Sequence, residues 1–362
     1  MLNLALNFNI CIFLTNYYKF YNSIFFFLLS NPKIKQMKNL LKLTNLTLLF
    51  FVGFSTLSCS DDDDDYVSPT GPLNIVETAL NTSDLSNLVA ALSVADGNLL
   101  DVLSGGEYTV LAPNNFAFET FLTDNGFASL SDVPTDVLSN ILLNHVITGT
   151  VNSAALVDAG YGYTSTNATN MDGDNLSLYF DTSNGVVFNG DSSVISADIE
   201  ASNGIVHVVD EVIVLPTVVT FAASNPAFAT LVAALTREDH TTDFLSILST
   251  TTEPAPFTVF APTNDAFGSL LSELGLNALG DIPLSTLEAT LATHVVVEAN
   301  VRSTDLVNGM PITTIGSPLT VSLTAGAQLV DTNNRISNII AVDVQAYNGV
   351  IHVIDKVLLP TL

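Results

Sequence analysis

The sequence contains few basic residues, and almost all of its charge is negative. Its 362 residues include nine Lys and Arg against 36 Asp and Glu. Only four basic residues follow Cys59, and they are Arg237, Arg302, Arg335 and Lys356, which leaves this part with a net charge of −32. A surface of that charge repels phosphate backbones and anionic lipid heads. The composition therefore argues against nucleic-acid binding and against direct electrostatic membrane binding, and it favours a monomer.

Cysteine is nearly absent. The sequence has two cysteines, Cys11 and Cys59, and both lie near the N-terminus. The remaining 303 residues therefore have neither a disulfide nor a thiol nucleophile. Because no covalent crosslink is available, stability must come from the burial of apolar side chains.

Motifs for catalysis and cofactor binding are missing as well. The sequence contains no HExxH, no GxSxG, no P-loop and no GxGxxG. No carboxylate pair is marked by apolar surroundings, and the histidine spacing shows no set of converging metal ligands. Asp172-Gly173-Asp174-Asn175 lacks the oxygen spacing of a calcium loop and is interpreted as a turn. We expect a protein that is not an enzyme and that uses no metal and no cofactor.

Residues 37–58 are typical of a bacterial secretory signal. Met37 is followed by two lysines, a mostly apolar run over 46–52 and small residues before Cys59. Ser55-Thr56-Leu57-Ser58-Cys59 resembles a lipoprotein processing site, although Thr56 stands where an aliphatic residue is usual. We therefore expect Cys59 to carry a lipid and to become the first residue of the mature chain.

Residues 1–36 do not fit this pattern. Their two apolar stretches are interrupted by Asn16, Lys19 and Asn22. A transmembrane helix needs about 20 continuous apolar residues, so this segment does not qualify. We interpret it as an over-extended leader and expect translation to begin at Met37.

An acidic tract follows the lipidation site. Ser60 leads into Asp61, Asp62, Asp63, Asp64 and Asp65. A run of like charges is usually a solvated spacer, but directly after Cys59 it resembles the export signal of Bacteroidetes-type surface lipoproteins. Residues 59–72 are thus interpreted as the lipidated cysteine and a flexible acidic tether. The protein is expected in the bacterial outer membrane, attached through its lipid anchor only and facing the cell exterior.

The rest of the chain contains a long duplication. YTVLAPNNFAF at 108–118 returns as FTVFAPTNDAF at 257–267, and NGIVHVVDEV at 203–212 returns as NGVIHVIDKV at 348–357. The offsets of 149 and 145 residues are far longer than a solenoid repeat and match the size of one folding domain. The sequence therefore predicts two tandem domains with almost no linker between them, so that one packs directly against the other.

Each copy begins with helical spacing and ends with strand spacing. Apolar residues recur at helical intervals over 85–92 and 228–235, and again in the segments that precede His145 and His294. The second half alternates with period two around an Asn-Gly pair, which predicts a β-hairpin. Helices followed by antiparallel strands indicate an α+β domain.

These motifs resemble those of the fasciclin-like domain family. TVFAPTNDAF at 258–267, the histidine at 294 and NGVIHVIDKVLLP at 348–360 are similar to the two signature motifs and the central histidine of that family. We assign domain 1 to 73–216 and domain 2 to 217–362. The resemblance implies that each is a β-sandwich wedge with a helical layer, and that the protein has an extracellular role in adhesion or matrix attachment.

The family-motif residues are expected to be mainly structural. Asn115 or Asp265 is predicted to cap the helix after the first motif. His207 and Asp210 lie three residues apart on a strand and therefore face opposite sides, so they form no dyad. The motif residues are Pro113, Asn115, Phe118, His145, His207, Pro262, Thr263, Asn264, Asp265, Phe267, His294 and His352.

The two copies differ at several of these positions. Domain 2 has Thr263-Asn264-Asp265 where domain 1 has Asn-Asn-Phe, so a retained contact is expected in domain 2. Asn144 and Thr293 precede the central histidines, where the family often has tyrosine, so the adhesive epitope of animal relatives is not carried over. His240 has no counterpart in domain 1 and is expected to be exposed and without a role.

The sequence predicts a surface adhesion or interaction protein. Its partner would be extracellular matrix, polysaccharide or another cell-surface protein, recognised through a surface rich in neutral polar groups. The alternative is a binding module for a small apolar ligand between the helical layer and the sheet. A well-formed apolar pocket in one domain and not in the other would favour that alternative.

Overall fold

The computed structural model describes residues 71–361. The leader, the signal peptide, Cys59 and the acidic tract lie outside the described residues, so the predictions made for them stay predictions. Residues 71–361 belong to one compact unit. Every contact reported below lies within these residues, so all of them are present in the soluble chain 66–362 used in the experiments below.

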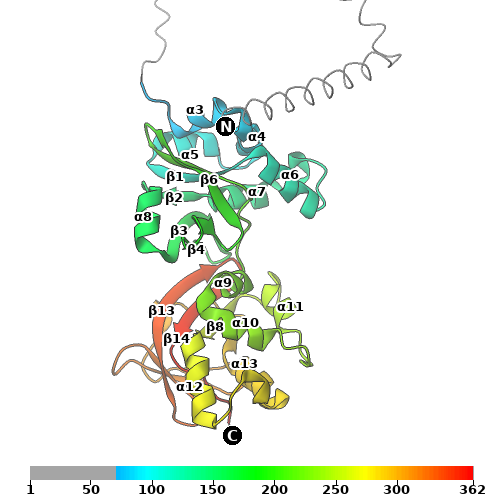
Figure 1. The fold of residues 1–362 in the computed structure, drawn as a ribbon, viewed down its shortest axis with the longest axis vertical. Helices are drawn as coiled ribbons and strands as arrows, with labels where there is room; N and C mark the ends of the chain where they lie inside the picture. Colours follow the sequence, from blue (N-terminus) through cyan, green and yellow to red (C-terminus); the bar gives the residue numbers. More distant parts are fainter. Residues whose placement is uncertain (1–70, 362) are drawn as a thin grey trace, which may run out of the picture. The chain divides into compact units, whose positions relative to one another are not determined.

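Domain 1 begins with three helices and ends with five consecutive strands, and β1 and β2 lie among the helices between them (Figure 1). Its helices are α3 (Ile75–Leu80), α4 (Ser86–Val94), α5 (Leu99–Gly105), α6 (Asn115–Asp124), α7 (Thr135–Leu143) and α8 (Ser153–Ala159). Its strands are β1 (Tyr108–Pro113), β2 (Val146–Thr148), β3 (Tyr161–Thr169), β4 (Asn175–Asp181), β5 (Val187–Phe188), β6 (Ser192–Ala201) and β7 (Gly204–Val209).

Domain 2 repeats this plan, with a short 3₁₀ turn at Ser303–Asp305 where domain 1 has α8. Its helices are α9 (Val218–Ser224), α10 (Ala229–Leu235), α11 (Phe244–Ser249), α12 (Asn264–Leu274) and α13 (Leu284–Thr293). Its strands are β8 (Phe257–Pro262), β9 (Val295–Val296), β10 (Pro311–Ile312), β11 (Leu319–Ser322), β12 (Gln328–Val330), β13 (Ile336–Ala346) and β14 (Gly349–Ile354).

The strands of each domain form a seven-stranded sheet with the same connectivity. The order is β2-β1-β7-β6-β5-β4-β3 in domain 1 and β10-β11-β12-β13-β14-β8-β9 in domain 2. The predicted hairpins are β6–β7 and β13–β14. The sequence did not reveal that β1 pairs parallel with β7, and β8 with β14. This pairing places the two signature motifs of each domain side by side.

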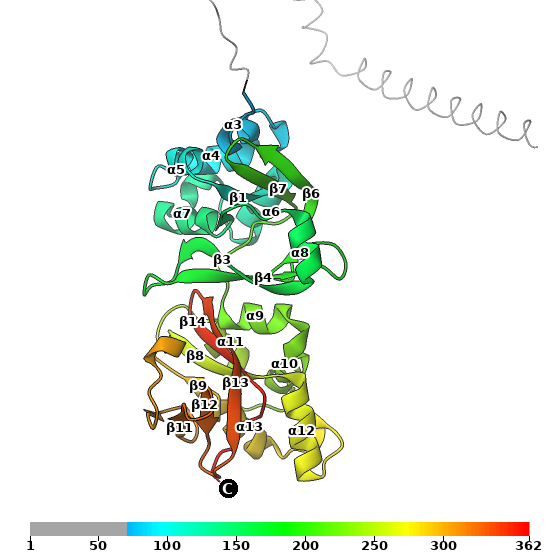
Figure 2. The ribbon, with the colours of Figure 1, turned by 90° about the vertical axis from the view of Figure 1, so that its left-hand side faces the viewer.

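Each sheet folds over on itself along one long strand. The first two residues of β6 pair with β5, whereas the rest of the strand pairs with β7 through two register shifts. β13 makes the same transition between β12 and β14. In Figure 2, β3 and β4 accordingly run across the direction of β6 and β7. The α+β class and the β-sandwich wedge with a helical layer are both confirmed.

Each domain has two apolar cores, one on each side of the motif strands. On β1, Val110 and Ala112 face the helices, and Leu111 between them faces the interior of the wedge. On β8, Val259 and Ala261 face the helices, and Phe260 faces the interior of the wedge. The alternation of strand side chains thus fills both cores from one strand. In Figure 1, α9 and α10 lie beside β8 and β14 on the helical side.

The two domains are in direct contact. The backbone N–H of Tyr347 donates to Pro216 O at 2.7 Å, and the Asn225 amide donates to the Tyr163 hydroxyl at 3.1 Å. Tyr179 of domain 1 is buried among the residues of the helix-side core of domain 2. The nearly linker-free junction expected from the sequence is therefore a packed one.

No single helix within 71–361 has the length and apolarity needed to cross a membrane. Two bent helix pairs reach that length together, namely Ser83–Val94 with Leu99–Gly105 and Val218–Ser224 with Pro226–Leu235. Both pairs supply buried side chains to the helix-side cores.

Candidate functional site

The first motif ends a strand and starts a helix, but the cap lies earlier than predicted, by one residue in domain 1 and by two in domain 2. Asn114 Oδ1 accepts from Ala117 N at 2.8 Å, and Thr263 Oγ1 accepts from Ala266 N at 3.3 Å. The prediction that Asn115 or Asp265 caps this helix is therefore wrong. Both capping residues are good N-caps, so the change of type between the copies preserves the local structure.

The second residue after the proline of the first motif is an asparagine in both domains, and its side chain connects two parts of the helical layer. Asn115 Oδ1 accepts from Asn87 N at 2.9 Å, and its Nδ2 donates to Ser83 O at 3.1 Å. Asn264 makes the corresponding bonds with Thr230 N and Pro226 O, both at 2.8 Å. These contacts fix α6 and α12 against the preceding helices, so the asparagine acts inside the fold. The neighbouring Pro113, Pro262, Phe118 and Phe267 are buried.

The central histidines lie at the ends of helices rather than on them. His294 is the C-cap of α13, and His145 follows the C-cap of α7. In each, Nδ1 donates to the carbonyl four residues earlier, at 2.8 Å for His145 and 2.7 Å for His294. Nε2 accepts from the backbone N–H of Ile213 at 2.8 Å or of Leu358 at 3.0 Å. Each neutral imidazole thus ties a helix end to the segment that follows the last strand.

Burial lowers the pKa of both central histidines to about 4. The pKa is low because burial in the apolar core strongly disfavours the charged imidazolium. The hydrogen bond to the backbone carbonyl favours the charged form, but by less. The preceding residues Asn144 and Thr293 are fully buried as well. This region of each domain is therefore interior, with no face open to a partner.

The histidines of the second motif also serve the backbone. The Nε2 atoms of His207 and His352 lie 2.9 Å from Val151 O and 2.8 Å from Val301 O. Asp210 instead accepts from Ser193 N on the next strand, so the His207–Asp210 pair is not a dyad. His352 stacks on Phe260 at 5.8 Å between ring centroids, and burial lowers its pKa.

The Asn of the Asn-Gly pair has a role that the sequence did not reveal. Its side chain reaches out of the hairpin to the start of the domain: Asn203 Oδ1 accepts from Ile75 N at 2.9 Å. Its Nδ2 donates to Leu103 O at 2.7 Å and to Gly106 O at 3.0 Å. Asn348 makes the matching three bonds in domain 2 at 2.8 to 2.9 Å. One side chain therefore joins the first helix, the third helix and the hairpin.

The Gly of the pair permits close packing of the parallel strands. A Cβ atom on Gly204 would lie 1.9 Å from Tyr108 O, and one on Gly349 would lie 2.1 Å from Phe257 O. The two glycines have φ of +148° and +152° and already belong to the strands, so Asn-Gly does not fill both turn positions as predicted. The signal available in the sequence was the return of both residues at the same offset as the histidine.

Comparison with known sequences agrees with this geometry. The chain matches the Fasciclin domain at residues 83–216 and again at 226–360. This chain belongs to the fasciclin domain family. Protein sll1483 of Synechocystis is 37% identical over 145 residues, which are 40% of this chain and 74% of that protein.

Two further relatives are a surface protein and a solved structure. The cell surface glycolipoprotein MPB83 of Mycobacterium bovis is 41% identical over 95 residues, which are 23% of this chain and 41% of that protein. The domain pair from the insect cell adhesion molecule fasciclin I covers 77% of this chain and 97% of its own, with 22% identity and a TM-score of 0.47.

The exposed positions of the first motif differ between the fasciclin domains. Asp265 lies in the first turn of α12 and is exposed, and Phe116 takes its place in domain 1 with 66% of its surface exposed. These are the motif positions that face solvent. A contact specific to either copy would involve them.

His240 differs from its prediction. Its side chain is 6% exposed, with Nε2 2.6 Å from Ala234 O and Nδ1 3.3 Å from Glu288 Oε1. Glu288 also accepts from the backbone N–H of Thr241 at 2.7 Å. The loop between α10 and α11 is thereby attached to α13, and His240 is part of this attachment.

Within the described residues, 71–361, no three His, Cys, Asp or Glu side chains lie close enough together to hold a metal ion. The Asp172–Asp174 turn is organised by Asn170, whose Oδ1 accepts from the backbone N–H of both aspartates. Asp174 faces Arg302 of domain 2 at 3.0 Å.

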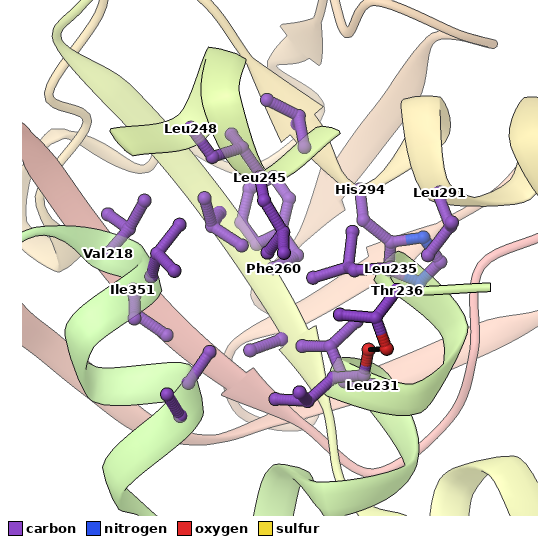
Figure 3. A pocket seen from close by; sticks show the side chains of 17 residues that line it. Val218, Leu231, Leu235, Thr236, Leu245, Leu248, Phe260, Leu291, His294 and Ile351 are labelled. Atoms are coloured by element: carbon purple, nitrogen blue, oxygen red, sulfur yellow. Dashed lines mark hydrogen bonds between the residues drawn. The ribbon is translucent and has the colours of Figure 1, made fainter. Parts of the chain in front are cut away.

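Domain 2 contains an apolar pocket between its helices and its sheet (Figure 3). Its volume is about 140 Å³. The walls come from α9, α10, α11 and α13 on one side and from β8, β9 and β14 on the other. Figure 3 shows Leu231, Leu245, Phe260 and Ile351 around the space.

The corresponding place in domain 1 is almost filled. There the cavity has a volume of about 10 Å³ and is lined by residues such as Leu88, Leu103, Val110 and His145. A well-formed pocket thus occurs in one fasciclin domain and not in the other, which is the observation that favours the small-ligand alternative.

Proposed function

We propose that this protein is a lipid-anchored adhesion or interaction protein on the outer face of a bacterial outer membrane. Fasciclin domains occur in cell-adhesion and cell-surface proteins. The signal over 37–58, Cys59 and the acidic tract Asp61 to Asp65 support the lipid anchor and its outward orientation. The partner is an extracellular matrix component, a polysaccharide or a protein of another cell, and the chain acts as a monomer.

The observation that carries this proposal is the internal use of the motif side chains. The central histidines, the motif asparagines and the second-motif histidines all bond to the backbone of their own domain. His145 and His294 line the cavities between helices and sheet, but their ring nitrogens are occupied by backbone partners. The motifs therefore maintain the fold, and recognition is left to exposed side chains.

An exposed apolar strip on β13 of domain 2 is suited to such recognition. Ile340 and Val342 are 56% and 44% exposed, where the register shifts between β13 and β14 occur. Ile195 on β6 occupies the equivalent position in domain 1 and is also exposed. Exposed apolar side chains surrounded by neutral polar groups are typical contact residues.

The test is a binding screen with residues 66–362 as a soluble chain. We expect binding to whole cells or to a polysaccharide array, and we expect Ile340→Asp to reduce it while the thermal midpoint stays unchanged. Thr320→Asp, at another exposed position of domain 2, is the control and should bind normally. The absence of binding to any cell, matrix protein or glycan would refute the proposal.

The anchor is tested separately. Cys59→Ala should abolish lipid labelling and release the protein from the membrane fraction. Replacing Asp61 to Asp65 with Ala should protect the chain from protease added to whole cells, because it would remain on the inner face. Retention without Cys59, or unchanged cleavage without the aspartates, would contradict these two assignments.

The second candidate function is the binding of a small apolar ligand. It is favoured by the pocket of about 140 Å³ in domain 2 and its near absence in domain 1.

A further inference from the structure

We propose that domain 2 binds a neutral hydrocarbon group of about six carbons, such as one aromatic ring or the end of an alkyl chain, in its apolar pocket. The inference deepens the second candidate function and rests on the pocket alone. It is independent of adhesion, because the exposed strip on β13 contributes no residue to the pocket wall.

The size of the pocket sets the size of the ligand. A buried apolar cavity of about 150 Å³ in another protein stays dry and accepts benzene, and the pocket here has about 140 Å³. The cavity of about 10 Å³ in domain 1 is at the limit for a single water. Of these two helix–sheet cavities, the one in domain 2 therefore has room for an organic group.

The walls offer no free hydrogen-bonding side chain. Thr236 and His294 are the two lining residues with polar side chains. Thr236 Oγ1 donates to Val232 O at 2.9 Å, and this bond is drawn in Figure 3. Both ring nitrogens of His294 are occupied by backbone partners. A polar group placed inside would lose its bonds to water without replacement, so the part of the ligand that enters is hydrocarbon.

The pocket reaches the surface where the three helices α9, α10 and α11 meet. Ala223 and Thr236 are exposed, and Leu235 and Leu245 are half-buried, whereas Ala222 and Leu248 behind them are buried. A ligand can therefore leave a polar end in solvent at this opening.

The charge around the opening selects against an anion. Domain 2 carries thirteen acidic residues against four basic ones. The basic residue next to the lining residue Thr236 is Arg237, and its guanidinium is already bound to Asp239 and to Ile282 O. A carboxylate near Thr236 would find Arg237 already paired, in a domain of net negative charge, so a neutral ligand is preferred.

The larger volume is accompanied by longer loops around α11 and by a smaller wall side chain at Val218, where domain 1 has Ile75. Ile75 and Val218 bond to equivalent hairpin asparagines, which aligns α3 with α9. With that alignment most wall residues are of similar type in the two domains. The connection before α11 is four residues longer than the one before α5, and the connection after it is five residues longer.

The experiment is an NMR titration of residues 66–362 with benzene and with 1-hexanol. We expect saturable shifts of backbone resonances in α9, α10 and α11 and no saturable shifts in α3, α4 and α5. Sodium hexanoate should bind at least tenfold more weakly than 1-hexanol. The two probes have the same number of carbons, but hexanoate carries a negative charge. Equal binding of hexanoate would overturn the preference for neutral ligands.

Two matched substitutions test the location. Ala222→Leu fills the pocket and should weaken benzene binding at least tenfold, whereas Ala79→Leu at the equivalent position in domain 1 should leave it unchanged. Val218→Ile copies Ile75 of domain 1 and should weaken binding several-fold in a chain that folds normally.

Three results would overturn the proposal. They are the absence of saturable shifts with either neutral probe, shifts of equal size in the two domains, and unchanged benzene affinity in folded Ala222→Leu and Val218→Ile. A failed adhesion screen together with saturable benzene binding would refute the adhesion function and leave the pocket proposal intact.

Discussion

The two fasciclin domains share the polar contacts inside the fold and differ in their charge, in their helix–sheet cavity and at one exposed motif position. The central histidine bonds to its helix at 2.8 Å in domain 1 and 2.7 Å in domain 2, and the hairpin asparagines each make the same three bonds. These bonds connect segments that are far apart in sequence, and so they hold the helices to the sheet. Their repetition shows which residues the fold requires.

The differences lie in charge, in the pocket and at one exposed motif position. Domain 1 has eighteen acidic residues and no Lys or Arg, whereas all four basic residues that follow Cys59 belong to domain 2. Arg335 uses its charge inside domain 2, where it bonds to Glu273, Asp331 and Val357 O. Functions specific to one copy are therefore to be sought where the copies differ.

The largest effect is expected from replacing the strand glycine that both domains share. Gly349→Ala or Gly204→Ala would place a methyl group about 2 Å from a strand carbonyl, at a φ that other residues rarely adopt. Because the parallel strands would have to separate, the cost should exceed the roughly 3 kcal/mol of ordinary overpacking and unfold the affected domain. Circular dichroism and urea unfolding measure this.

The matched control for these glycines is Gly268→Ala in α12, where a new Cβ meets nothing within 4 Å. It should be neutral or stabilise the helix by up to about 1 kcal/mol. A folded Gly349→Ala chain with normal stability would show that the close approach of the strands is dispensable.

The second prediction is that acid lowers the stability of both domains to a similar extent. The pKa of each central histidine falls from 6.5 to about 4 on folding, so between these values the unfolded chain binds a proton that the folded chain does not. Stability is complete above pH 6.5 and falls as the pH drops to about 4, by about 3 kcal/mol for each histidine.

Urea unfolding between pH 7.5 and 4 measures this loss. His294→Gln should lower stability at pH 7 and flatten the pH dependence of domain 2, while His145→Gln does the same for domain 1. The carboxylates titrate in the variants as well, so they serve as the reference. An equally steep pH dependence in the variants would assign the loss to other groups.

The third prediction is that replacing the hairpin asparagine costs more stability in domain 2 than in domain 1, because the asparagine is more deeply buried there. Asn348 is fully buried and Asn203 is half-buried, although they make the same bonds. Asn348→Ala should therefore cost about 2 kcal/mol and Asn203→Ala about 1 kcal/mol, because water can replace part of the partners of Asn203. Equal losses in thermal unfolding would show that the difference in burial does not matter.

The smallest expected effect exchanges the exposed motif residues. Phe116→Asp should stabilise α6 by a few tenths of a kcal/mol, since an acidic residue in the first turn interacts favourably with the helix dipole. Asp265→Phe should lose a similar amount in α12. If Phe116 contacts a partner, binding in the adhesion screen falls for Phe116→Asp with no loss of stability, and unchanged binding would exclude that role.

The sequence was most informative where a pattern was local or repeated. The duplication, the α+β order, the hairpins and the family resemblance all followed from motifs that return at one spacing. The predicted helix cap was wrong by one residue in domain 1 and by two in domain 2. In domain 1, Asn114 and Asn115 are equally suitable in sequence, and only the end of β1 decides between them. His240 was assigned to the surface because its partners, Ala234 O and Glu288, come from other segments.

The sequence by itself determined that the chain has two fasciclin domains, because their signature residues meet fixed backbone needs at fixed intervals. Only the tertiary structure decided what these residues do. The parallel pairing of β1 with β7 explains the glycine, and the reach of Asn203 to Ile75 explains the asparagine. The pocket was likewise beyond the sequence, because wall residues of mostly similar type leave about 10 Å³ in domain 1 and about 140 Å³ in domain 2.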